Sequence, residues 1–147
     1  MSVQQRMLVG FYVLVALAGL YTTWSQNLQL MTPGMGPFDP YTVFLEQTRV
    51  NAASRSITLD LGFFLLAAVA FMVIEARRLG VRFVWLYVIL AFAVAISVLF
   101  PLFMAARELR IAKNPNASAA WRLTASDLVG LAVVAAAVLA VTWRLVS

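Results

Sequence analysis

Four long apolar runs alternate with polar segments along this chain. The runs cover about residues 7–23, 57–74, 83–106 and 128–146. A helix needs about 20 apolar residues, with about 17 as the lower limit, to cross the hydrocarbon core of a bilayer. The pattern therefore predicts an all-α membrane protein, with four transmembrane helices in one antiparallel bundle over residues 1–147. The first run includes Ala16-Leu17-Ala18, which has the form of a signal-peptide cleavage site, but we expect this run to persist as a span.

The segment between the first two runs is too long for a simple turn. Residues 33–37, with two prolines and two glycines, have the composition of a loop. Asp39-Pro40 then has the form of a helix start, and apolar side chains follow at helical spacing with charged ones opposite. We predict a short amphipathic helix over about residues 40–50, lying either on the membrane surface or on the protein.

Composition supports lipid as the surroundings of these runs. Hydrophobic residues make up 63% of the chain and charged residues 12%, about half the charged share usual in soluble domains. The net charge is +5, but the basic residues flank apolar runs instead of forming the clustered face that nucleic acid requires. Cysteine and histidine are absent, which excludes disulfides and metal or haem ligation through those side chains. We expect no metal, no cofactor and no nucleic-acid partner.

The distribution of charge gives an expected orientation. Four spans would place both termini on one side of the membrane, and the numbers of Lys and Arg on the two sides would be nearly equal. The side with the termini has the larger net positive charge, because five of the six acidic residues lie on the other side, and Arg77, Arg78 and Arg82 crowd one short link there. This favours N- and C-termini in the cytoplasm.

Asp60 is the acidic residue whose position is most informative, because it lies one turn inside the second run. Ionisable side chains in membrane spans usually face a partner or a cavity. If the second and third runs form a hairpin, Asp60 lies near Arg107 and Glu108, with Trp24 at the same mouth of the bundle. The cluster would be either a functional polar site or, as the more ordinary interpretation, an ion pair that locks the hairpin.

Glu75 is expected at the opposite membrane face. Fifteen residues of helix rise about 22 Å, so Glu75 and Asp60 cannot act on one substrate bond. We expect Glu75 to form an ion pair with Arg78, one helical turn away, or with Arg6 or Arg144.

Two local signals concern helix shape. Pro101 lies inside the third run and predicts a kink there, because proline removes one backbone hydrogen bond. Thr124 and Asp127 have the spacing of a capping box and predict the start of the fourth helix.

A series of polar and aromatic landmarks occurs in a fixed order along most of the chain. The landmarks are Phe44-Leu45-Glu46-Gln47, Asn51, Ser54, Asp60, Glu75-Ala76-Arg77-Arg78-Leu79, Trp85, Pro101-Leu102-Phe103 and Arg107-Glu108. From about Leu8 to Arg110 the chain thereby resembles a family of small bacterial membrane proteins known as domain of unknown function 2834. The resemblance implies a multi-pass protein of the bacterial inner (cytoplasmic) membrane with a three-span core, and it implies no activity. The helix expected after Asn116 is an addition to that pattern.

Three functions are compatible with the sequence. The first is a non-catalytic bundle that binds a lipid or a partner membrane protein, since no acid–base pair, nucleophile or metal set is visible. The second is a dimeric proton-coupled exporter of small molecules that uses Asp60. The third is a membrane enzyme that acts on a lipid or isoprenoid substrate, with Asp60 as general acid oriented by Arg107. We expect the first, and homo-oligomerisation stays open.

Overall fold

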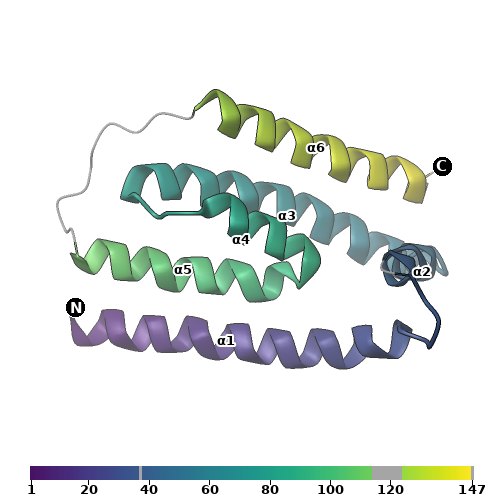
Figure 1. Ribbon diagram of the computed structural model, residues 1–147, viewed down its shortest axis with the longest axis horizontal. Coiled ribbons are helices and arrows are strands. Elements are labelled where there is room, and N and C mark those ends of the chain that lie inside the picture. Colours follow the sequence, from purple (N-terminus) through teal and green to yellow (C-terminus); the bar gives the residue numbers. More distant parts are fainter. Residues whose placement is uncertain (37, 114–123, 147) are drawn as a thin grey trace.

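A computed structural model describes residues 1–36, 38–113 and 124–146. Over these residues all regular structure is helical, as the sequence predicts. The elements are α1 (Val3–Asn27), the 3-10 helix η1 (Leu28–Leu30), α2 (Asp39–Gln47), α3 (Ala52–Leu79), α4 (Val84–Ala93), α5 (Ile96–Lys113) and α6 (Ala125–Val146). The four longest helices lie side by side, with the shorter α4 packed between α3 and α5 (Figure 1).

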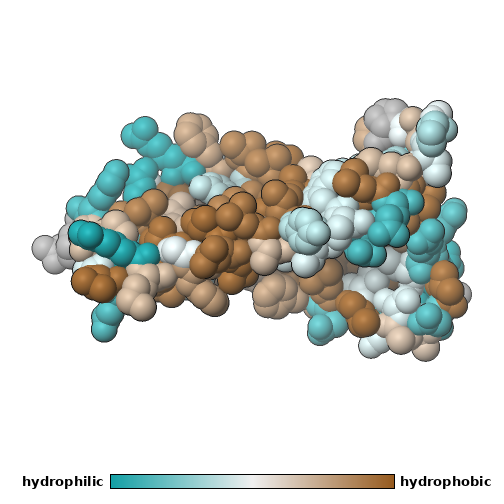
Figure 2. All heavy atoms as spheres, turned by 90° about the horizontal axis from the view of Figure 1, so that it is seen from below, coloured by the Kyte–Doolittle hydropathy of each residue, from teal (hydrophilic) through white to brown (hydrophobic). Residues whose placement is uncertain are grey.

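Three helical segments are long and apolar enough to cross a membrane. Val3–Leu30 and Ala52–Leu79 have 28 residues each, and Ala125–Val146 has 22. At 1.5 Å per residue each exceeds the roughly 30 Å of hydrocarbon in a bilayer. On the face shown in Figure 2, hydrophobic residues cover the middle of the bundle and hydrophilic ones gather toward its two ends. These features indicate a multi-pass membrane protein.

The third apolar run does not form one helix. The prediction of a single span over residues 83–106 is wrong, because the helix stops at Ala93, the chain reverses at Val94–Ala95, and α5 runs back beside α4. The rings of Tyr87 and Phe103 meet edge to face, with centroids 5.7 Å apart, and join the two arms. Because the ten residues of α4 rise only about 15 Å, α4 alone cannot cross the hydrocarbon core.

The end of α1 closes the α4–α5 turn. The indole Nε1 of Trp24 donates a hydrogen bond to the carbonyl oxygen of Val94 at 3.2 Å, which satisfies a backbone group that the broken helix leaves free. Gly19 lets α1 approach α5 closely, because a Cβ there would lie 3.0 Å from the carbonyl oxygen of Ser97. The chain reverses at this point and not at Pro101, which lies inside α5.

The reversal changes the positions of the termini. α1 and α6 start at one end of the bundle and run in the same direction, so the two termini lie at opposite ends (Figure 1). The expectation that both termini share one side is therefore corrected. That expectation assumed that all four apolar runs cross the membrane. The third run instead returns to the end of the bundle from which it starts.

A helix is present in the first connection, where the sequence predicts one at about residues 40–50. It is α2, which has Pro40 in its first turn. The carboxylate of Asp39 accepts a hydrogen bond from the backbone N–H of Gly36 at 2.7 Å, which fixes the entry into this helix. Tyr41 and Phe44 are 50% and 45% exposed. The placement of α2 on the membrane surface stays a prediction.

Candidate polar site at one end of the bundle

Two buried carboxylates meet near the C-terminal ends of α3 and α5. Glu75 and Glu108 are only 6% and 8% exposed. Arg107 lies between them, with Nε donating to Glu75 at 2.7 Å and Nη1 donating to Glu108 at 2.6 Å. Arg78, one helical turn from Glu75, donates to the same carboxylate at 2.9 Å. Two acids and two arginines thus compensate each other, and the cluster ties α3 to α5.

A second cluster surrounds Asp127, whose side chain is fully buried in the first turn of α6. Arg77 donates two hydrogen bonds to it, from Nε at 2.7 Å and from Nη2 at 2.6 Å. The indole Nε1 of Trp85 donates a third at 3.1 Å, and the backbone N–H of Thr124 a fourth at 2.9 Å. The bidentate ion pair is the strong form of a charged hydrogen bond. One carboxylate therefore joins α3, α4 and α6.

Of the residues predicted at the bundle mouth, the structure brings Arg107 and Glu108 together but places neither beside Asp60. Asp60 is exposed in the N-terminal half of α3, whereas Arg107 and Glu108 lie at the other end of the bundle, beside Glu75. The cause is the α4–α5 reversal, which makes α5 parallel to α3 and carries Arg107 to the C-terminal end of α3. Trp24 caps the reversal instead of lying beside an acid.

Asp127 is the residue of this site that sequence reasoning missed. The sequence predicts it only as a helix cap, and both capping bonds with Thr124 are present, at 2.9 and 3.2 Å. Its other partners, Arg77 and Trp85, are far away in the sequence, so spacing alone could not find them. The available signal was an acid at the start of one apolar helix and a pair of arginines at the end of another.

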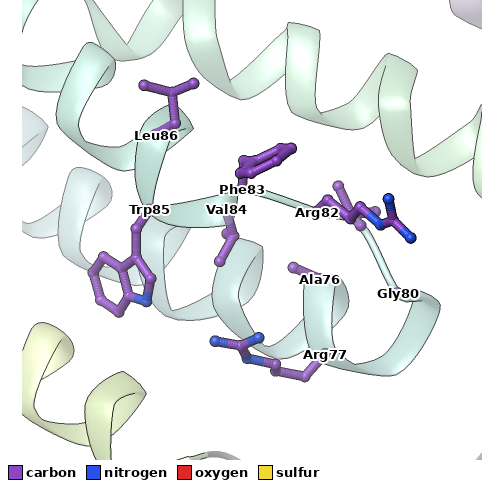
Figure 3. Close-up of a pocket in the computed structure, with 9 residues that line it drawn as sticks. Ala76, Arg77, Gly80, Arg82, Phe83, Val84, Trp85 and Leu86 are labelled. Carbon is purple, nitrogen blue, oxygen red and sulfur yellow. The ribbon is translucent and has the colours of Figure 1, made fainter.

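A hollow of about 570 Å³ opens beside these clusters, at the turn from α3 to α4 (Figure 3). Gly80 ends α3 with φ 68°, and Phe83 precedes α4 with φ 61°. Two left-handed residues so close together reverse the chain sharply. In Figure 3, Arg77 and Trp85 point toward each other on one side of the hollow, and Arg82 extends on the other. Of the residues that the structure describes, two arginines and no acidic residue line it.

A family model described as "Protein of unknown function DUF2834" matches residues 11–109. The chain belongs to this family. No curated protein and no solved structure matches the chain. The match confirms the resemblance seen in the sequence and covers most of α1 and α5 and everything between them.

The two clusters differ in their relation to the DUF2834 region. Glu75, Arg107 and Glu108 all lie inside residues 11–109, so the first cluster belongs wholly to the family core. The second cluster joins Arg77 and Trp85 of that core to Asp127, which lies outside the matched residues. In this DUF2834 protein the helix beyond the family match is therefore docked through a buried charge.

Proposed function

We propose that this DUF2834 protein is a non-catalytic membrane bundle that binds a lipid at its basic end. The basic end is the end where α3 and α5 finish and where α1 and α6 begin. The three acids there, Glu75, Glu108 and Asp127, all accept hydrogen bonds from arginines, so each is already engaged in an ion pair within the bundle. Arg82, at the hollow, has no acidic partner among the described residues. This contrast supports a binding role.

The basic residues also support an orientation in a bacterial inner membrane. Among the described residues, the basic end carries Arg6, Arg77, Arg78, Arg82, Arg107, Arg110 and Lys113. The opposite end carries Arg49, Arg55 and Arg144, and Arg122 lies outside the described residues. Lys and Arg concentrate on the cytoplasmic side of membrane proteins. We therefore place the basic end in the cytoplasm.

In this orientation α1, α3 and α6 cross the membrane, and the α4–α5 hairpin enters and leaves from the cytoplasmic side. A backbone reversal at membrane depth is tolerated where protein covers it. Trp24 from α1 supplies such cover at Val94. The N-terminus then lies in the cytoplasm and the C-terminus on the other side of the membrane.

The exporter and the enzyme receive less support from the same geometry. Both use Asp60, and the enzyme also needs Arg107 beside it. Asp60 is exposed, and none of the ion pairs among the described residues includes it. If the lipid test below fails, a partner membrane protein at the basic end is the binding role that remains.

The test is lipid binding by the purified full-length protein. After lipid removal in a mild detergent, a bacterial polar lipid extract should raise the midpoint of thermal unfolding by about 5–10 °C once the free lipid concentration is about 100-fold above its Kd. Above the Kd the rise should continue with the logarithm of the free lipid concentration, and Asp60→Asn should not change it. An absent rise would contradict the proposal, as would a pH-dependent substrate flux that Asp60→Asn abolishes.

A further inference from the structure

The hollow at the α3–α4 turn has features of a ligand site. Its volume of about 570 Å³ lies within the roughly 300–1,000 Å³ of small-molecule sites. Phe83, on its wall, has φ 61° and is the only residue other than glycine with a positive φ in the described chain. A bulky side chain rarely adopts this conformation. Backbone strain of this kind is found most often at functional sites.

One side of the hollow favours an anion. Arg82 is exposed and forms no ion pair among the described residues, whereas Arg77 directs Nε and Nη2 to Asp127. The helix α4 begins beside Arg82 with no side-chain cap and no acidic residue in its first turn. The N–H groups of Leu86 and Tyr87 donate to the carbonyl oxygen of Phe83. The N–H groups of Val84 and Trp85 and the positive end of the helix dipole are therefore what α4 offers to a ligand. Together with an arginine they suit a phosphate group.

The other side of the hollow is apolar. Phe83 and Leu86 are 76% and 54% exposed, and in Figure 3 both side chains point away from Arg77. A ligand that contacts both sides must combine a phosphate with hydrocarbon. Among the described residues no acidic side chain lines the hollow, so the ammonium of a choline or ethanolamine headgroup would gain no ion pair there. Basic pockets on the cytoplasmic side of membrane proteins bind anionic headgroups for the same reason.

We infer that the hollow binds an anionic phospholipid from the cytoplasmic leaflet. The phosphate lies between Arg82 and the first turn of α4, and one acyl chain follows Phe83 and Leu86. This inference rests on the proposed function and adds to it the class of lipid and the residues that select it.

The experiment compares phosphatidylglycerol with phosphatidylcholine of the same acyl chains. Each lipid is titrated into the delipidated full-length protein, and bound lipid is counted by native mass spectrometry. We expect phosphatidylglycerol to bind about fivefold more tightly, the effect of one basic residue near a membrane surface. Arg82→Gln should abolish this preference, and Arg82→Lys should retain most of it. Lys113→Gln, which removes the same charge at the same end but outside the hollow, should leave it unchanged.

Each alternative result overturns a different statement. Equal binding of the two lipids by the unaltered protein overturns the anionic preference but leaves the proposed function standing. A preference that survives in Arg82→Gln overturns the site. If inorganic phosphate or glycerol phosphate displaces phosphatidylglycerol at equal concentration, the site recognises a free anion and not a lipid. If neither lipid binds, the proposed function fails as well.

Discussion

Among the described residues of the basic end, the carboxylate of Asp127 accepts more hydrogen bonds than that of Glu75 or Glu108. It is fully buried and accepts hydrogen bonds from Arg77, Trp85 and Thr124. Removing one partner of a fully buried ion pair costs about 3–5 kcal/mol, because the other charge is left without compensation. The loss here is smaller because the side chain of Arg77 is 35% exposed and keeps part of its solvation. We expect Asp127→Asn to lower the free energy of unfolding by about 2–3 kcal/mol. Unfolding by sodium dodecyl sulfate in mixed micelles measures this loss.

The chain offers a matched control for that substitution. Asp60→Asn makes the same chemical change in another apolar helix, but Asp60 is exposed and forms no ion pair among the described residues. We expect its effect to stay within about 0.5 kcal/mol. Equal losses in the two variants would show that burial and pairing at Asp127 do not set its contribution.

At the scale of elements, the contact between α4 and α6 depends on one glycine. A Cβ built on Gly130 would lie 2.1 Å from Cη2 of Trp85, so any side chain there must displace the indole. The displacement would also break the hydrogen bond from the indole to Asp127. We expect Gly130→Ala to destabilise the protein by about 1–3 kcal/mol. The same alteration at Gly10, where nothing lies within 4 Å of the added Cβ, should be neutral or slightly stabilising.

A double variant separates the clash from a general effect of alanine in α6. In Trp85→Ala the indole is gone, so adding Gly130→Ala to it should cost much less than in the unaltered protein. Non-additivity of this kind is the signature of a direct contact. Additive losses would place the cost elsewhere than at the indole.

The long helices could be predicted from the sequence, but the hairpin could not. Hydropathy and length identify α1, α3 and α6, because a run of about 20 apolar residues has few other stable solutions. The third run is equally apolar, and neither glycine nor proline marks its reversal at Val94–Ala95. The one proline, Pro101, lies inside α5. Contacts from α1, made by Trp24 and Gly19, accompany the turn, and such contacts have no local signal in the sequence.

The same reversal explains why the candidate site was placed at the wrong end. The capping bonds at Thr124 and the short-range pair of Glu75 with Arg78 depend on residues three apart, which helical geometry brings together. The partners of Arg107 depend instead on the direction of α5. If the second and third apolar runs both crossed the membrane, Arg107 would lie beside Asp60. With the α4–α5 hairpin, Arg107 lies beside Glu75 instead.

For the whole molecule, the hairpin changes the balance of charge across the membrane. With four crossings the basic residues divide almost evenly between the two sides. With three crossings and the hairpin, Arg107, Arg110 and Lys113 move to the side of Arg82, and the basic residues concentrate at one end. The positive-inside rule then assigns an orientation that the four-span arrangement leaves nearly undecided. An orientation signal is typical of membrane proteins, which favours the three-crossing arrangement.

Single-cysteine labelling tests this arrangement directly, because the chain contains no cysteine of its own. Arg82→Cys and Lys113→Cys flank the α4–α5 hairpin, and Val50→Cys lies in an exposed position between α2 and α3. We expect a membrane-impermeant maleimide to label positions 82 and 113 from the cytoplasmic side only and position 50 from the opposite side only.

Four crossings would place positions 82 and 113 on opposite sides, so labelling of these two from different sides would refute the hairpin in the membrane. If positions 82 and 113 react together but from the periplasmic side, the hairpin stands and the orientation reverses.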